Sequence, residues 1–267
     1  MITTTDIFVP YRYTKSPSRT SRHALDSVRE RSRTGLFSSS KTVSSILSAS
    51  EIKLLVITAP LTDKRKMMAK SLKIKLVSCP MEATHVIVGD QDHHIRRTAK
   101  LMASLCVTPY ILKAEWLEDC YKQKKIKSSG HYTLLNDYIA EKAYSFSMKQ
   151  TIKEGNERRK FGGLLNGWSI CICEGVAGNK APKEADLRTM IEAAGGTWLE
   201  PSQVSLQDEA DLSHVIVITS HPATADQLKD ENAKTAAENG AGYFTTSWLF
   251  DSFMHQKMFG IRRGLGF

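Results

Sequence analysis

Short apolar runs alternate with amphipathic stretches along most of the chain. Residues 54–57 form a continuous apolar run, which is typical of a strand buried on both faces of a parallel sheet, and residues 168–173 are expected to form the equivalent strand of the second half. The pattern predicts further strands at 75–77, 84–88, 110–112, 197–199, 214–219 and 243–245. It predicts helices at 63–72, 96–105, 114–124, 183–194, 225–239 and 247–257. Each half of the chain therefore has the order βαββαβα.

Two tryptophans mark an internal duplication. Residues 111–119, which contain Trp116, recur as residues 243–251, which contain Trp248. Residues 84–88 recur as 213–217. Two matches in the same order and at nearly the same offset indicate one supersecondary plan used twice. We expect both tryptophans to lie in the cores of the modules, where their large apolar rings are best buried.

The duplication divides the chain into four segments. Residues 1–49 are rich in Ser, Thr and Arg and are expected to be a disordered tail or linker, in which a helix over 23–33 is an alternative. Residues 50–130 form the first module and residues 167–267 the second. The connection, 131–166, is expected to pack between the modules and to contain a helix over 141–158.

Proline and glycine residues predict where the first helix of the second module begins and ends. Pro182 is suited to the first turn of the helix over 183–194, because the missing N–H of proline costs nothing there. Gly195-Gly196 is expected to end that helix, since glycine readily adopts the left-handed conformation at a helix C-terminus.

The net charge of +9 favours acidic partners. The first 50 residues contribute +5 of it, from eight Lys and Arg against three Asp and Glu. The five cysteines include no C-x-x-C pair, and Cys171 and Cys173 are expected to be buried in a strand, so a reducing compartment is indicated. No apolar run approaches the length of a membrane span and no signal peptide is present, so we expect a soluble intracellular protein.

No set of residues suggests catalysis or a metal site. The chain has no P-loop, no G-x-S-x-G and no H-E-x-x-H motif. His93-His94 has no neighbouring cysteine or carboxylate cluster that would complete a set of metal ligands. We therefore expect a binding protein without cofactor or metal rather than an enzyme.

These features resemble the BRCT domain: a four-stranded parallel sheet with three helices, a tryptophan in the last helix and Gly-Gly after the first helix. The two copies resemble a tandem BRCT pair, which implies an α/β fold of two modules packed in tandem. The first copy has Lys73-Ile74-Lys75 in place of Gly-Gly. A narrower resemblance, carried by residues 95–100, 157–159 and 174–176, is to the BRCT repeats of DNA-damage checkpoint mediators.

A phosphate site is predicted at the carboxyl edge of the first sheet, where open α/β sheets bind ligands. The Thr58 hydroxyl and the Ala59 N–H follow the first strand, and both are donors suited to phosphate oxygens. Lys100 can supply the positive charge that a dianionic phosphoserine requires. The resemblance assigns phosphoserine binding to this trio, although the family usually has glycine where Ala59 stands.

Two further groups of residues are predicted to contact the peptide. Arg97 precedes Lys100 by three residues and is expected on the same helix face. The resemblance implies that Arg97 holds the peptide main chain or its C-terminal carboxylate, which a guanidinium can bind through two hydrogen bonds. In the second module, the groove is expected to be closed by Gly178, Asn179, Lys180 and, near the start of the last helix, Phe250.

The second module is expected to lack a phosphate site of its own. Glu174-Gly175 stands where the first module has Thr58-Ala59, and a carboxylate would repel phosphate. The sequence therefore predicts a single phosphate site, in the first module.

The resemblance implies a phosphoserine-peptide reader in the DNA-damage response. Its expected partner is the phosphorylated C-terminal tail of histone two-A, gamma form, with a phosphoSer-Gln motif; other phosphoproteins are possible partners. The expected location is the nucleus, on chromatin and not on a membrane. Two alternatives stay open: a phosphate-independent scaffold, and direct DNA binding through the basic tail and linker.

Overall fold

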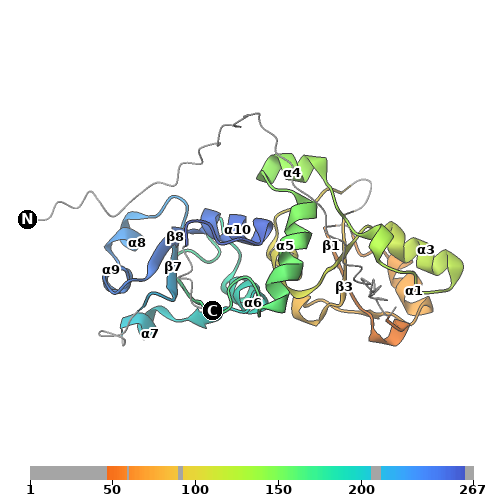
Figure 1. Cartoon of the computed structure of the whole chain (residues 1–267), viewed down its shortest axis with the longest axis horizontal. Coiled ribbons are helices and arrows are strands. Elements are labelled where there is room, and N and C mark those ends of the chain that lie inside the picture. Colours follow the sequence, from red (N-terminus) through yellow and green to blue (C-terminus); the bar gives the residue numbers. More distant parts are fainter. Residues whose placement is uncertain (1–46, 59, 90–92, 206–211, 262–267) are drawn as a thin grey trace, which may run out of the picture. The chain divides into compact units, whose positions relative to one another are not determined.

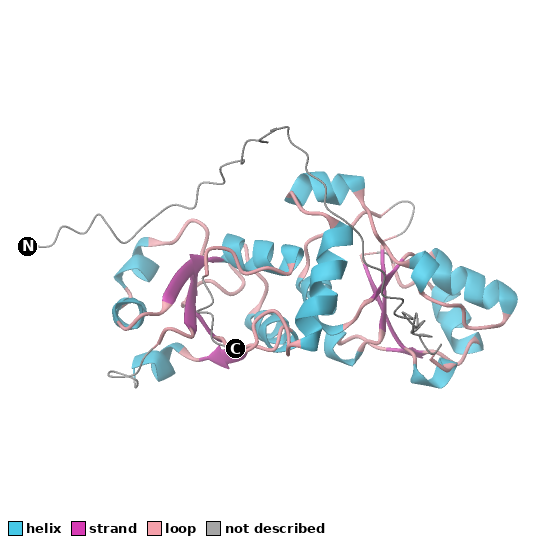
Figure 2. Ribbon diagram, in the orientation of Figure 1, coloured by secondary structure: helices cyan, strands magenta, loops and turns pink. Residues whose placement is uncertain are grey.

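The computed structural model describes residues 47–58, 60–89, 93–205 and 212–261 (Figure 1). It contains two four-stranded parallel sheets with strand orders β2-β1-β3-β4 and β6-β5-β7-β8 (Figure 2). The first sheet consists of β1 (Lys53–Ile57), β2 (Lys75–Leu76), β3 (His85–Val88) and β4 (Tyr110–Leu112). The second consists of β5 (Ser169–Ile172), β6 (Thr197–Leu199), β7 (Val215–Thr219) and β8 (Gly242–Thr245). The prediction of a duplicated α/β fold is confirmed.

Three helices accompany the first sheet: α1 (Asp63–Ser71), α2 (Ala99–Val107) and α3 (Glu115–Gln123). The connection contains α4 (Tyr138–Tyr144) and α5 (Met148–Lys160). Five helices accompany the second sheet: α6 (Glu184–Ala193), α7 (Pro201–Ser205), α8 (Ala225–Lys229), α9 (Glu231–Glu238) and α10 (Thr246–His255). None of the helices in the described ranges is both long and apolar enough to cross a lipid bilayer.

Strand β1 shows how the first sheet is covered on both faces. Leu55 and Ile57 face a core that includes α2 and continues into the second module. Leu54 and Val56 point to the other face, toward a separate core formed with α1 and α3, which lie side by side (Figure 1). Successive side chains of a strand point to opposite faces, so an uninterrupted apolar run fits a strand covered on both sides.

Helix α5 of the connection ties the C-terminal ends of α2 and α10 together. The Arg159 guanidinium donates to the Leu105 carbonyl of α2 at 2.8 Å. The Arg158 Nε donates to the Gln256 carbonyl, just beyond α10, at 3.3 Å. Cations are favoured at helix C-termini, where carbonyl groups lack partners within the helix.

The two tryptophans make equivalent contacts in the two modules, and their expected place in the core is confirmed. Trp116 is fully buried and Trp248 is 9% exposed. The Trp116 indole N–H donates to the Lys127 carbonyl at 3.1 Å, and that of Trp248 to the Phe259 carbonyl at 2.8 Å. Both acceptors lie eleven residues after the tryptophan. Each indole therefore fixes the segment that follows the last helix of its module.

Two boundaries predicted in the second module are wrong. The single helix over 225–239 is two helices, because Asp230 adopts an extended ψ of 112° and its carboxylate caps α9. Helix α6 begins at Glu184 with Lys183 at the N-cap, so Pro182 precedes the helix instead of occupying its first turn. Gly195, by contrast, has a φ of +77° and ends the helix as predicted.

The connection also differs from expectation. The helix over 141–158 is divided into α4 and α5 by Ser145, which adopts a left-handed φ of 53°. Helix α7 was not predicted at all, because five residues give no clear periodicity. The alternative helix over 23–33 lies outside the described residues.

His85 is a buried polar residue of β3. Its ring stacks on Tyr110 and Trp116, and its Nε2 shares a hydrogen bond of 3.1 Å with the Ser129 hydroxyl. Burial lowers the pKa of His85 to about 4, because the imidazolium form is poorly solvated there. Its counterpart in the repeat, His214, is exposed.

We expect acid to destabilise the protein through His85. The unfolded chain takes up the proton near pH 6.5 and the folded chain only near pH 4, so the stability is present above pH 6.5 and is lost as the pH falls toward 4. Between pH 7 and pH 5 the loss should be about 2 kcal/mol. Chemical denaturation at both pH values should show this difference shrinking in His85→Gln and persisting in His214→Gln; equal behaviour of the two variants would contradict it.

Candidate functional site

The carboxyl ends of β1 and β3 meet at one edge of the first sheet. Ile57 is paired with Val88, and the Gly89 N–H donates to the Ile57 carbonyl at 3.3 Å. Thr58 leaves this edge directly after β1, and the segment after β3 leads from the same edge to α2. The edge is the part of an open α/β sheet at which ligands usually bind.

Thr58 has two unusual features. Its φ is +68°, a left-handed conformation that is rare for a β-branched residue and costs about 1–3 kcal/mol. Its hydroxyl is buried and has no hydrogen-bond partner among the described residues. Ala59, the second member of the predicted trio, lies outside the described residues. A strained residue with an unused buried donor is a feature typical of ligand sites.

Lys100 lies in the first turn of α2. Thr98 caps this helix, and its hydroxyl accepts from the Leu101 N–H at 3.3 Å. Lys100 is exposed, and its ammonium makes no ion pair within the described ranges. The first turn of a helix favours anions, since its N–H groups carry partial positive charge. A free ammonium at that position adds a full positive charge.

The predicted position of Arg97 on the same helix face as Lys100 is wrong. Helix α2 begins at Ala99, so Arg97 lies before the N-cap in an extended segment. The Thr98 side chain caps the first turn of α2, so the helix begins directly after Thr98. Spacing of three residues therefore does not align Arg97 with Lys100.

Arg97 instead reaches from the first module to the connection and the second module. It donates to the Asp251 carboxylate of α10 at 2.9 Å. Its guanidinium also lies over two rings, 5.3 Å from the centre of Tyr144 and 5.5 Å from that of Phe250. Burial raises the pKa of Asp251, while the nearby Arg97 acts in the opposite direction.

The four residues predicted in the second module have different surroundings. Phe250 is buried and lies in the middle of α10, not near its start, where it contacts Arg97. Gly178, Asn179 and Lys180 form an exposed turn, in which the Gly178 N–H donates to the Pro182 carbonyl at 3.0 Å. The structure therefore brings Phe250 into contact with Arg97, whereas the turn over residues 178–180 is closed by its own backbone hydrogen bond.

The matching edge of the second sheet is filled by one side chain. The amide of Gln227 donates to the Glu174 carbonyl and to the Ser220 hydroxyl, both at 3.0 Å. Its oxygen accepts from the backbone N–H groups of Ser220 and Thr224. Gly175 follows with a φ of +75°, a conformation open to glycine at little cost. Polar groups that are open at the first edge are thus satisfied by protein at the second.

Sequence reasoning missed Gln227 and Asp251. The spacing of Thr224 and Gln227 matches a capping box, which was a usable signal for a helix start. Asp251 is the repeat counterpart of Asp119, which accepts from the Tyr132 hydroxyl at 2.9 Å. The duplication could mark the position of Asp251 but not its partner, because the two aspartates bind different groups.

The comparisons with known proteins agree with the duplicated fold. Residues 37–134 match the family model described as the Regulator of Ty1 transposition protein 107 BRCT domain. PAX-interacting protein 1 of Mus musculus is 27% identical over 150 residues, 54% of this chain and 13% of that protein. Mediator of DNA damage checkpoint protein 1 of Mus musculus is 30% identical over 129 residues, 46% of this chain and 6% of that protein. The chain thus spans a small part of the length of these relatives.

Solved structures cover both modules at once. The S. pombe Brc1 BRCT5-BRCT6 domains superpose with a TM-score of 0.58 at 18% identity, over 78% of this chain and 94% of theirs. The complex of Rtt107p with phosphorylated histone two-A gives a TM-score of 0.50 at 14% identity, over 79% and 90%. At these identities the likeness concerns the fold. Residues of the first module thus match a BRCT domain family, and the two modules together have the fold of solved tandem BRCT pairs.

Proposed function

We propose that this chain is a phosphoserine-peptide reader and an adaptor in the DNA-damage response. Its ligand is the phosphorylated C-terminal tail of histone two-A at DNA breaks, so it acts in the nucleus on chromatin. The observation that carries the proposal is the Thr58 hydroxyl, buried and without a partner among the described residues at the carboxyl edge of the first sheet. A phosphate oxygen would supply the missing acceptor.

The electrostatics of the first module suit a dianion. Residues 51–130 contain fifteen Lys and Arg against eight Asp and Glu, a net charge of +7. Residues 167–267 contain eight against thirteen, a net charge of −5. Lys100 and the N-terminus of α2 add a positive charge and a favourable dipole to this module. A phosphoserine, at close to two negative charges, is therefore attracted to the first module.

The Arg97 side chain is fixed by its contacts in the free protein. The Phe250 and Tyr144 rings flank its guanidinium, and Asp251 accepts from one of its nitrogens. A guanidinium has five N–H donors, so several stay available for a peptide main chain or a terminal carboxylate. Because the side chain is ordered before binding, little conformational entropy is lost when the peptide arrives. In this proposal Arg97 reads the end of the tail.

A single phosphate site per chain follows from the second module. Gln227 uses its amide to satisfy the groups at the edge that corresponds to Thr58. Displacing those hydrogen bonds would leave buried polar groups without partners, which costs about 1–3 kcal/mol for each group. We therefore propose that the chain binds one phosphopeptide.

The relatives support the choice of ligand. Rtt107p, whose structure has the same fold, is bound to phosphorylated histone two-A in one of the solved complexes. A relative matched over 46% of this chain is named as a mediator of the DNA-damage checkpoint.

Lys100→Met should lower the affinity for a phosphorylated histone two-A tail peptide by roughly 10- to 100-fold, because a charged hydrogen bond is worth about 1.5–3 kcal/mol. Isothermal titration calorimetry with phosphorylated and unphosphorylated peptides measures this. Lys113→Met is the matched control, since Lys113 is also exposed and directly follows a strand at the same sheet edge. Equal affinity for the two peptides would overturn the proposal in favour of a phosphate-independent scaffold.

Thr58→Val should weaken phosphopeptide binding by at least about 10-fold without lowering the melting temperature, because the hydroxyl has no described partner to lose in the free protein. Thr108→Val should lower the melting temperature and leave phosphopeptide binding unchanged. The Thr108 hydroxyl donates to the Thr84 carbonyl in the core, away from the proposed site. Thermal unfolding and peptide titration of both variants check this pair. A Thr58→Val variant that melts earlier and binds normally would show a purely structural role.

Amidation of the peptide C-terminus should weaken binding by roughly 10-fold, since Arg97 would lose a charged acceptor. Competition between free and amidated phosphopeptides measures the ratio without altering Arg97, whose contact with Asp251 links the modules. Indifference to amidation would remove the carboxylate from the role of Arg97 and leave the phosphate site untouched.

A further inference from the structure

One short segment of the first module is strongly basic. Residues 63–75 contain six Lys and Arg and one acidic residue, a net charge of +5. Residues 51–267 together carry only +4, so everything outside this segment sums to −1. The segment comprises α1 and β2. Its six basic residues are Lys64, Arg65, Lys66, Lys70, Lys73 and Lys75.

Four of these lysines form what we call the α1–β2 basic surface: Lys66, Lys70, Lys73 and Lys75. All four are exposed, because α1 turns Met68, Ala69 and Leu72 toward the core it shares with α3. Among the described residues, Lys66 alone of the four has an acidic partner, Asp63 at 3.0 Å. That pair is exposed to solvent, so the Coulombic attraction within it is weak.

The positions of these lysines are unfavourable for the stability of the fold. Lys66 and Lys70 are separated by one helical turn, where like charges repel. Lys75 is in register with Lys53 on the neighbouring strand, which places two cations side by side. Lys73 adopts a left-handed φ of +59°, whereas its counterpart in the second module is Gly195 with a φ of +77°. None of the three arrangements helps the fold.

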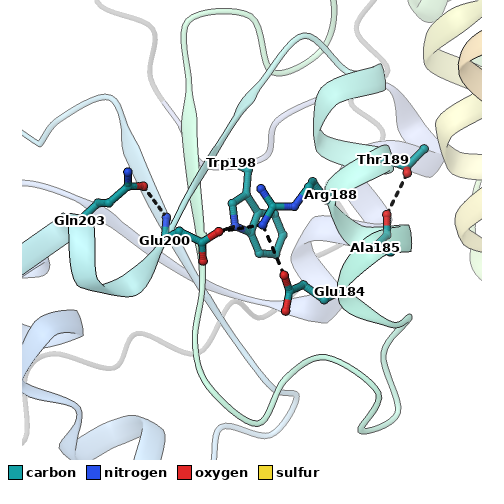
Figure 3. A network of polar contacts seen from close by, with 7 residues as sticks. All are labelled: Glu184, Ala185, Arg188, Thr189, Trp198, Glu200 and Gln203. Carbon is teal, nitrogen blue, oxygen red and sulfur yellow. Dashed lines mark hydrogen bonds and ion pairs between the residues drawn. The ribbon is translucent and has the colours of Figure 1, made fainter.

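The equivalent elements of the second module show that the fold does not require this charge. Helix α6 carries three acidic residues and one arginine. Arg188 is neutralised there by Glu184 at 3.3 Å and Glu200 at 2.7 Å, and it lies over the ring of Trp198 at 4.5 Å (Figure 3). Figure 3 shows these groups converging on the guanidinium between α6 and the end of β6. The same position in the fold is thus acidic and internally paired.

We propose that the α1–β2 basic surface binds the phosphate backbone of double-stranded DNA. Unpaired ammonium groups are point charges that suit phosphates without reading bases. Residues 61–75 contain no aromatic side chain on which unstacked bases could stack, which favours duplex over single-stranded nucleic acid. They also contain no Asn or Gln to read adenine edges, and Arg65 donates to the Pro60 carbonyl at 2.7 Å, so we expect little preference for DNA sequence.

The DNA surface and the proposed peptide site lie at opposite edges of one sheet. Thr58 follows the carboxyl end of β1, whereas Lys75 is paired with Lys53 at its amino end. Lys73 and Lys70 lie just before β2, near the same amino edge. The two ligands can therefore bind together, and the DNA proposal stands even if the histone tail is not the ligand of the other edge.

The test is DNA binding by the full chain with three lysines neutralised. Fluorescence anisotropy with a labelled duplex of about 20 base pairs and arbitrary sequence, between about 50 and 200 mM salt, spans the range over which backbone contacts lose affinity. The test variant is Lys70→Gln, Lys73→Gln and Lys75→Gln together. The matched control neutralises three exposed lysines of the connection, Lys142→Gln, Lys149→Gln and Lys153→Gln, which removes the same net charge.

The α1–β2 variant should bind at least about 10-fold more weakly, and the slope of log K against log salt should fall by about 2 to 3. The control should keep most of the affinity and of the slope. Equal losses in both variants, or wild-type DNA binding by the α1–β2 variant, would overturn the proposal. The proposal would also be overturned if the α1–β2 variant lost affinity for an acidic peptide while its affinity for DNA stayed unchanged. Both variants should keep phosphopeptide affinity, which separates this outcome from failure of the peptide site.

Lys73→Gly separates the DNA role from a structural one. Glycine relieves the left-handed backbone at this position, so the melting temperature should rise by about 2–4 °C. DNA affinity should fall by about 2- to 5-fold, because one backbone contact is lost. A variant that is more stable and binds DNA as tightly as the wild type would remove Lys73 from the surface.

Discussion

Burial of α2 on nearly all sides governs the arrangement of both modules. Residues 101–106 are six consecutive buried positions, as expected of a helix that is covered all around. The first sheet covers one side, and α5, α6 and α10 cover the others. A helix held this firmly fixes the position of its own N-terminus. Lys100 and the Arg97 segment before it are therefore placed by the packing of both modules.

The same packing explains why the two copies of one fold have diverged. Helix α6 is packed against α2, so its charges are paired or turned away from the junction. Helix α1 packs on α3 within its own module, and its outer face carries exposed lysines. The edge of the first sheet keeps an open hydroxyl at Thr58, while Gln227 fills the corresponding edge. Under the two proposals, the first module keeps its sheet edges for ligands, whereas the second module supports the junction.

Charge distribution links the two proposals. The first module, with a net charge of +7, bears a candidate phosphoserine site at one sheet edge and a candidate DNA surface at the other. The second module, with −5, contributes Asp251 and Phe250 to the surroundings of Arg97. On chromatin, a phosphorylated histone tail and the neighbouring DNA duplex both carry phosphate groups and lie close together. Two weak contacts made by one rigid module would then reinforce each other by raising the effective concentration of the second ligand.

Periodicity and repetition were enough to establish the duplication, the two parallel sheets and the buried tryptophans, because these signals depend only on neighbouring residues and a fixed offset. The resemblance to the BRCT family, together with the ends of the predicted strands, nominated Thr58, Lys100 and Arg97, but it did not define their surroundings. The left-handed turn at Thr58, the start of α2 after Arg97 and the contact with Asp251, 154 residues away, depend on long-range packing. No local pattern encodes which distant carboxylate a guanidinium will meet, because that choice is made by the whole fold.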